Sequence, residues 1–207
     1  MSDRNKRRRV ADSRRGRFVV IVGPDGVGKT TVARALIARA GGSTGYFHFR
    51  PDVFHPILPA PSESMDPAID KGSPDGSRLG GWVRIVRNMM RFWAGYLVRV
   101  QPALSAGRLV VADRWAYGYL VQPAALKFYG PVWLARLVLR LLPQPDLVAN
   151  LIAPVEVIRS RKQELTSKEI SAELAEWSDL PARHLRSFDT QGPPDQVAAQ
   201  ILQELGR

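Results

Sequence analysis

The chain contains no cysteine, which excludes disulfides, thiolate metal sites and a thiol nucleophile. It also lacks an apolar run of the ~18 to 20 residues that a membrane-spanning helix needs. Its three histidines, His48, His55 and His184, show no metal-ligand spacing. These absences favour a soluble enzyme or binding protein of a reducing compartment, and we expect it to be cytoplasmic.

Acidic residues are scarce, because 19 Asp and Glu stand against 30 Lys and Arg and leave a net charge of +11. Residues 1–17 alone hold eight basic residues and two Asp, with almost no hydrophobic side chains. This composition predicts a disordered basic tail. Two interpretations of the tail stay open, a solvated segment and an electrostatic contact with nucleic acid or anionic lipid head groups.

Residues 18–207 fit a single α/β domain, since a chain of 207 residues with 45% hydrophobic content can bury a substantial core. Runs typical of strands alternate with runs typical of helices. The expected strands are 18–22, 46–49, 109–112, 147–152 and 185–188, and the expected helices are 31–37, 82–106, 131–142, 155–164, 167–177 and 194–205. The alternation predicts three layers, in which a parallel, doubly wound sheet carries helices on both faces.

Residues 51–81 interrupt this alternation with six prolines and scattered Ser, Gly and Asp. We expect a long loop that covers substrates. In the helix that follows, apolar residues at helical spacing predict one core-facing stripe: Trp82, Ile85, Val86, Met89, Phe92, Trp93 and Tyr96. Arg84, Arg87 and Arg91 share another face, where they are either solvated or directed into an anion pocket.

The most informative segment is Gly23-Pro24-Asp25-Gly26-Val27-Gly28-Lys29-Thr30, a complete G-x-x-x-x-G-K-[ST] pattern between an expected strand and an expected helix. Its glycines let backbone N–H groups approach phosphates at the positive end of a helix. Lys29 supplies a charge for the β and γ phosphates, and the Thr30 hydroxyl suits a Mg²⁺ ion. With Thr31 as a further hydroxyl, residues 23–31 are expected to bind ATP.

The segment Asp113-Arg114-Trp115 ends the expected strand 109–112, at the sheet edge where ligands of open parallel sheets bind. Guanine-specific switches need an Asn-Lys-x-Asp base reader, and the only Asn-Lys here lies in the tail. A motor ATPase would have a second acidic residue where Arg114 stands. A cation beside a carboxylate suits an anionic acceptor, which favours a kinase.

Together these motifs resemble the thymidylate kinase family of nucleoside monophosphate kinases, over roughly residues 18–205. The shared features are the acidic third loop position, Asp25, the arginine in Phe49-Arg50-Pro51, and the Asp-Arg-aromatic motif at 113–115. Residues 158–165 fall where that family places its lid, within about 155–170. The resemblance is strongest to a divergent bacterial branch, and it implies the P-loop kinase fold and a homodimer.

The resemblance further implies ATP- and Mg²⁺-dependent phosphoryl transfer to a nucleoside monophosphate, first of all dTMP. On the acceptor side, it implies that Asp25 contacts the sugar hydroxyl and that Arg50 and Arg114 grip the phosphate, with Arg87 and Arg91 as further candidates. Asp113 would orient an arginine and Mg²⁺-bound water.

A lid cation is also implied, with Arg159, Arg161 and Lys162 as candidates. Positions 159 and 162 share one face of a helix, whereas 161 points elsewhere. All three therefore cannot point at the transferred phosphoryl group.

The chain departs from the family at the residues that read thymine. Ala116 stands where the family has serine, Arg50-Pro51-Asp52-Val53 replaces Arg-Glu-Pro-Gly-Gly, and the stacking aromatic is expected at Phe92 or Trp93. The acceptor thus stays open between dTMP and another small phosphorylated metabolite. A nucleotide-binding regulatory module and a nucleic-acid-associated ATPase recruited by the tail are the other interpretations.

Overall fold

Five strands form one parallel sheet in the order β2-β3-β1-β4-β5. The computed structural model describes residues 15–55, 57–61, 78–161 and 166–206, so most of the predicted tail and Lys162 lie outside the described residues. The strands are β1 (Phe18–Val22), β2 (Thr44–His48), β3 (Leu109–Asp113), β4 (Leu147–Ile152) and β5 (Leu185–Asp189). The predicted α/β fold with a parallel, doubly wound sheet is confirmed.

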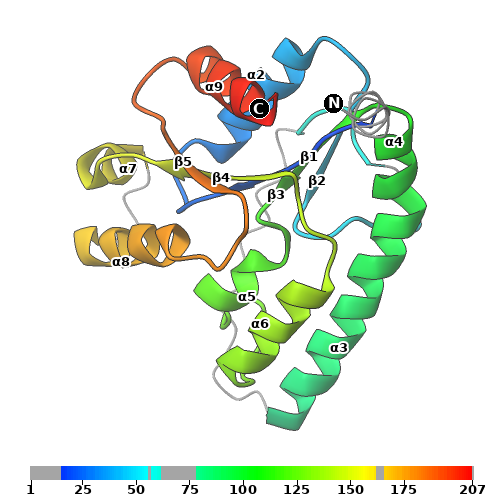
Figure 1. Ribbon diagram of the computed structural model, residues 1–207. Helices are drawn as coiled ribbons and strands as arrows, with labels where there is room; N and C mark the ends of the chain where they lie inside the picture. Colours follow the sequence, from blue (N-terminus) through cyan, green and yellow to red (C-terminus); the bar gives the residue numbers. More distant parts are fainter. Residues whose placement is uncertain (1–14, 56, 62–77, 162–165, 207) are drawn as a thin grey trace, which may run out of the picture.

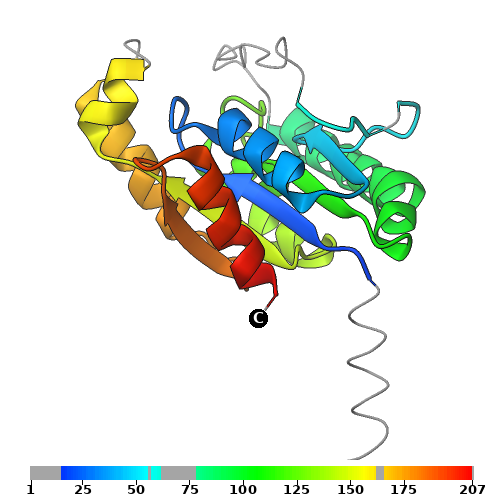
Figure 2. The same ribbon diagram turned by 90° about the horizontal axis from the view of Figure 1, so that it is seen from above.

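Helices cover both faces of this sheet (Figure 1). On one face, α2 (Lys29–Ala40) and α9 (Pro194–Leu205) lie side by side and pack on Val19 and Ile21 of β1 (Figure 2). On the other, α3 (Arg78–Gly95), α5 (Gly118–Val121) and α6 (Val132–Leu141) pack on the alternate β1 residues. Because β1 is buried on both faces, it is apolar throughout, as parallel strands usually are.

Two further helices, α7 (Val155–Arg161) and α8 (Ser167–Ser178), lie side by side at the end of the sheet where β4 ends (Figure 1). The start of α8 carries the predicted capping box, in which Thr166 and Glu169 bond reciprocally to each other's backbone N–H. Both predicted helices of the 155–170 region are present over the residues described there.

The long helix is interrupted once, by a π-helical turn at Tyr96–Val100 that leads into α4 (Gln101–Ser105). Pro102 follows this turn, and a proline has no N–H to continue the regular hydrogen-bond ladder. The element ends before Gly107, whose φ of 76° lies in the left-handed region, as the sequence predicts.

The apolar stripe of α3 is only partly a core surface, which corrects the expectation. Ile85 and Phe92 are fully buried, whereas Trp82, Val86 and Trp93 are 39%, 46% and 38% exposed. The stripe is wider than the surface that the sheet can cover, so its outer part remains at the protein surface.

Some boundaries of the helices and strands match the predicted ones, and others differ. Strand β4 and helix α9 have the predicted bounds. Strand β2 begins earlier than predicted, because Thr44 pairs with Leu109 in the parallel ladder. The predicted 51–81 loop is shorter, since α3 starts at Arg78.

The amino end of the domain also differs from the expectation. Gly16 N–H donates to Leu104 O at 2.7 Å and Arg17 O accepts from Val110 N–H at 2.8 Å, so the fold includes residues assigned to the tail. Among the helices of the described ranges, none is both long and apolar enough to span a membrane.

Candidate functional site

The phosphate-binding pattern forms a tight loop between β1 and α2. Gly23, Gly26 and Gly28 have φ values of 139°, 85° and 102°, which side-chain-bearing residues rarely adopt. A Cβ on Gly23 would lie 2.7 Å from the carbonyl oxygen of Leu151. Gly28 caps α2, so the loop ends at the positive pole of that helix, where anions bind favourably.

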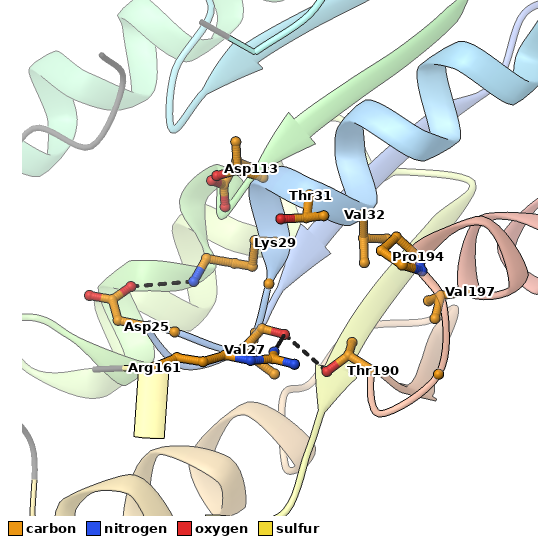
Figure 3. Close-up of a pocket in the computed structure, with 14 residues that line it drawn as sticks. Asp25, Val27, Lys29, Thr31, Val32, Asp113, Arg161, Thr190, Pro194 and Val197 are labelled. Carbon is orange, nitrogen blue, oxygen red and sulfur yellow. Dashed lines mark hydrogen bonds and ion pairs between the residues drawn. The ribbon is translucent and has the colours of Figure 1, made fainter. Parts of the chain in front are cut away.

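The loop lines a pocket of about 540 Å³ (Figure 3). From Asp113 at the end of β3 the pocket runs past the loop to Pro194 and Val197 at the start of α9. Its further lining residues are Asp25, Gly26, Val27, Gly28, Lys29, Thr30, Thr31, Val32, Arg161, Thr190 and Gly192. Its volume lies in the range of small-molecule sites. Thr31 is exposed and does not cap α2, whose cap is Gly28 without a side-chain bond.

The Lys29 ammonium is buried within the loop. Its Nζ donates to Gly23 O at 3.1 Å and Pro24 O at 2.9 Å, and it lies 3.3 Å from Asp25 Oδ1. Burial lowers the pKa of Lys29, and the charge of Arg114 lowers it further, although Asp113 and Asp25 oppose both effects. The lysine is therefore held where a phosphate in the loop would meet it.

Asp113 is buried at the end of β3 with one oxygen engaged and one unpaired. Its Oδ2 lies 3.3 Å from His48 Nδ1 and 3.5 Å from the Tyr46 hydroxyl. Its Oδ1 is buried without a hydrogen-bond partner in the part of the chain that the structure describes. Burial raises the pKa of Asp113, but the His48 hydrogen bond and the charges of Lys29 and Arg114 outweigh it and give a net lowering. The carboxylate is thus charged and able to accept a further ligand.

Arg114 connects this strand end to the phosphate loop. Its φ of 69° and the φ of 48° at Trp115 are left-handed values, which turn the buried guanidinium toward the loop. The guanidinium pairs with the Asp25 carboxylate and donates to Gln122 Oε1. Gln122 Nε2 in turn donates to Glu173 Oε1 of α8 at 3.0 Å. The structure therefore brings together the predicted Asp25 and Arg114, and adds Gln122 and Glu173, which the sequence analysis missed.

Arg50 lies next to a buried polar pair that the sequence analysis also missed. Its Nη1 donates to Asn88 Oδ1 at 2.9 Å, and Asn88 Nδ2 donates to the Tyr119 hydroxyl at 2.7 Å. Partial burial lowers the pKa of Arg50, and the charges of Arg91 and Arg87 act in the same direction. These arginines thus form one cationic group beside Arg50. Asn88 lies between the apolar stripe and the arginines of α3, and a polar amide at that boundary is the sequence signal that could have identified it.

The two candidates for the stacking aromatic, Phe92 and Trp93, lie in different surroundings. Phe92 is fully buried, with its ring 4.8 Å from Trp115 and 5.2 Å from Phe49. Trp93 lies on the outer side of α3, 6.3 Å from the ring of Tyr96. Phe92 is therefore not free to stack on a base, which corrects that expectation, and neither residue lines the pocket of the phosphate loop.

The two described lid arginines point in different directions from α7. Arg161 lines the pocket, and its Nη1 donates to Val27 O at 3.4 Å (Figure 3). Arg159 Nη1 instead lies 3.4 Å from Ser167 Oγ, and Arg159 is not among the pocket residues. Arg161 is therefore the one that reaches the phosphate loop.

Thr190, directly after β5, is a site residue for which the sequence offers no motif. Its hydroxyl donates to Val27 O at 2.9 Å and lies 3.2 Å from Ile152 O. It thereby ties the phosphate loop to the ends of β4 and β5. The neighbouring Asp189 accepts from Gln191 N–H at 2.8 Å and caps its own loop.

Comparison with known proteins places this architecture among solved folds. No protein-family model and no curated protein matches the sequence. Among solved structures, the thymidylate kinase of Candida albicans is 18% identical, with 93% of this chain and 92% of that chain covered and a TM-score of 0.55. The thymidylate kinase of Ehrlichia chaffeensis is 16% identical, with 93% and 99% covered and a TM-score of 0.50. The chain therefore has a divergent form of the thymidylate kinase fold.

Proposed function

We propose that this protein is a nucleoside monophosphate kinase that transfers the γ-phosphoryl group of ATP to a monophosphate, with dTMP as the first candidate. The observation that carries the proposal is the contact of Arg114 with Asp25. Through it, the Arg114 guanidinium adjoins the phosphate loop, where it can bind an acceptor anion next to the donor phosphates. A binder of a single nucleotide would need only the loop.

On the donor side, the loop and Lys29 bind the phosphates, and the base extends toward Pro194 and Val197. The residues at hand fit a Mg²⁺ ion, because Thr30 lines the same pocket as Asp113, whose buried Oδ1 has no partner among the described residues. Mg²⁺, when bound, neutralises charge on the donor phosphates.

On the acceptor side, the guanidinium groups of Arg50 and Arg114 match the geometry of a phosphate monoester. The acceptor phosphate has its second pKa near 6 and is largely dianionic at neutral pH, so it needs little help from a base. Asp113 accordingly orients its neighbours rather than taking a proton. Arg161, which lines the pocket, would stabilise the charge that develops on the transferred group.

In this proposal, Asn88 and Tyr119 help to select the acceptor. Their amide and hydroxyl lie beside Arg50, so an acceptor whose phosphate is bound by Arg50 would meet these two polar groups. A second candidate, a small phosphorylated metabolite other than a nucleotide, is favoured by the burial of Phe92, which leaves no base-stacking ring at that position.

The test is release of ADP from purified protein with ATP, Mg²⁺ and a panel of acceptors that includes dTMP, dUMP and sugar phosphates. We expect turnover with a nucleoside monophosphate and none in Lys29→Ala. The matched control is Arg39→Ala, at an exposed arginine in the last turn of α2. ATP binding without turnover on any acceptor would refute the kinase and leave a regulatory module.

A further inference from the structure

A second cavity, of about 590 Å³, shares no residue with the pocket of the phosphate loop. It is bounded by α6, by Tyr117, and by the segments that lead into β4 and β5. The phosphate loop follows the carboxyl end of β1, whereas Gln144 and Arg183 precede the amino ends of β4 and β5. Because all strands are parallel, Gln144 and Arg183 lie at the opposite end of the strands from the phosphate loop.

Three arginines and no carboxylate line this second cavity. Arg136 and Arg140 lie one turn apart on α6, and Arg183 faces them from the chain that enters β5. Within the described ranges, none of the three has a hydrogen-bond or ion-pair partner, whereas Arg186 nearby is paired with Glu204. Like charges at this helical spacing repel each other, so an anion between them would relieve an unfavourable field.

The other lining groups suit an organic body that carries the anion. Leu139 and Pro181 supply apolar contacts, and Tyr117 supplies a buried aromatic ring. Gln144 Nε2 donates to Leu139 O at 2.7 Å and to Leu142 O at 2.8 Å, which fixes the amide and turns its oxygen to other donors. A cavity of this volume with a few polar groups is typical of a small-molecule site.

We propose that this cavity binds the phosphate group of a second ligand, one with at least two negative charges. Arginine is the side chain best suited to this task, because its planar guanidinium can bind two phosphate oxygens at once. The group can belong to a soluble phosphorylated compound or to a lipid head group, since the recognising chemistry is the same.

The experiment uses the full chain with Lys29→Ala, which weakens phosphate binding at the first pocket. Titration calorimetry with inorganic pyrophosphate is expected to show saturable binding that weakens as salt is added. Adding Arg140→Ala or Arg183→Ala should reduce the affinity by about tenfold or more, as expected for hydrogen bonds to charged groups. Arg140→Lys, which keeps the charge but loses the two-pronged geometry, should fall between.

Arg39→Ala in the same background is the matched control and should bind as before. Vesicles of phosphatidylcholine with and without phosphatidic acid form the second arm of the test. Binding of these vesicles that depends on Arg140, without binding of pyrophosphate, assigns the site to a lipid head group and supports the proposal. The proposal is overturned if neither probe binds, or if binding survives both Arg140→Ala and Arg183→Ala.

Discussion

At the scale of single residues, Asp113 is a buried carboxylate that compensates the charge of neighbouring buried cations. Its charge balances those of Lys29 and Arg114, which are themselves buried. Replacing it by a neutral isostere leaves these cations without compensation in a medium of low polarity. We therefore expect Asp113→Asn to lower the free energy of unfolding at pH 7 by about 2–4 kcal/mol.

This loss should depend on pH in a defined direction. The pKa of Asp113 in the folded protein lies below its ordinary value of 3.8, which the unfolded chain retains. The stabilisation is therefore fully present above the unfolded value and is lost as the pH falls through the folded value. Urea unfolding of both proteins should show a constant difference down to about pH 5 and a shrinking one below it. Asp179→Asn, at the exposed end of α8, is the control and should change little at any pH.

At the scale of the element, the two arginines of α7 lie in different surroundings. Arg161 reaches the phosphate loop and Arg159 contacts Ser167. If the proposed kinase activity holds, Arg161→Ala should lower kcat by about 10²- to 10³-fold, the usual effect of removing a cation from a developing charge. Arg159→Ala should leave kcat unchanged in the same steady-state assay. An unchanged kcat in Arg161→Ala would remove α7 from the mechanism, and equal losses in both variants would contradict the distinction between the two arginines.

Helix α3 carries a glycine whose role is to let another segment approach. At Gly95, a Cβ would lie 2.1 Å from the carbonyl oxygen of Pro51. Gly-to-Ala changes inside helices usually stabilise by about 1 kcal/mol. Here we expect Gly95→Ala to destabilise by about 1–3 kcal/mol, because Pro51 must move. Since Pro51 follows Arg50, the acceptor KM should rise as well.

Thermal unfolding checks this expectation against Gly42→Ala. At Gly42 the nearest atom to an added Cβ is Ala40 O at 3.8 Å, which is ordinary contact. An unchanged or raised Tm in Gly95→Ala would mean that the close approach of Pro51 is not maintained in solution.

The sequence predicts well those elements that depend only on a local sequence pattern. The phosphate loop, β4 and α9 could be predicted because glycines, apolar runs and prolines act on their own neighbourhood. The exposure of Trp82 could not, since it depends on how much of α3 the sheet covers. The hydrogen bond between Asn88 and Tyr119 joins residues 31 positions apart and leaves no local pattern. Likewise, the helical spacing separated position 161 from 159, but only the packing of α7 showed that Arg161 faces the loop.

At the scale of the whole molecule, α3 with the π-helical turn that follows it, and α6, expose large apolar side chains, here called the α3–α6 face. It consists of Trp82, Val83, Val86, Met90, Trp93 and Leu97 with Val132, Trp133, Leu137 and Leu141. The two helices are neighbours (Figure 1), and the rings of Trp82 and Trp133 lie 5.6 Å apart between them. Large apolar patches are rare on monomeric proteins, so we expect this face to be covered in solution.

We expect a second copy of the chain to cover this face. A surface made of two neighbouring helices can pack against its own copy across a two-fold axis, the commonest arrangement of soluble oligomers. Light scattering during gel filtration should therefore give a dimer at micromolar concentration. The double variant Val83→Glu and Met90→Glu should be a folded monomer, because these side chains are 64% and 61% exposed within the chain. Its Tm should no longer depend on protein concentration, as that of the dimer does.

Phe54→Glu is the matched control, since Phe54 is 85% exposed but lies outside the α3–α6 face. It should leave the dimer intact, which separates an effect of this face from a general effect of added charge. A wild-type monomer at all concentrations, or a dimer that persists in the double variant, would contradict the assignment.

Dimerisation through this face should also depend on salt. Both helices carry arginines beside the face and no carboxylate. Because the two copies bring like charges together, the dimer should tighten as salt screens them.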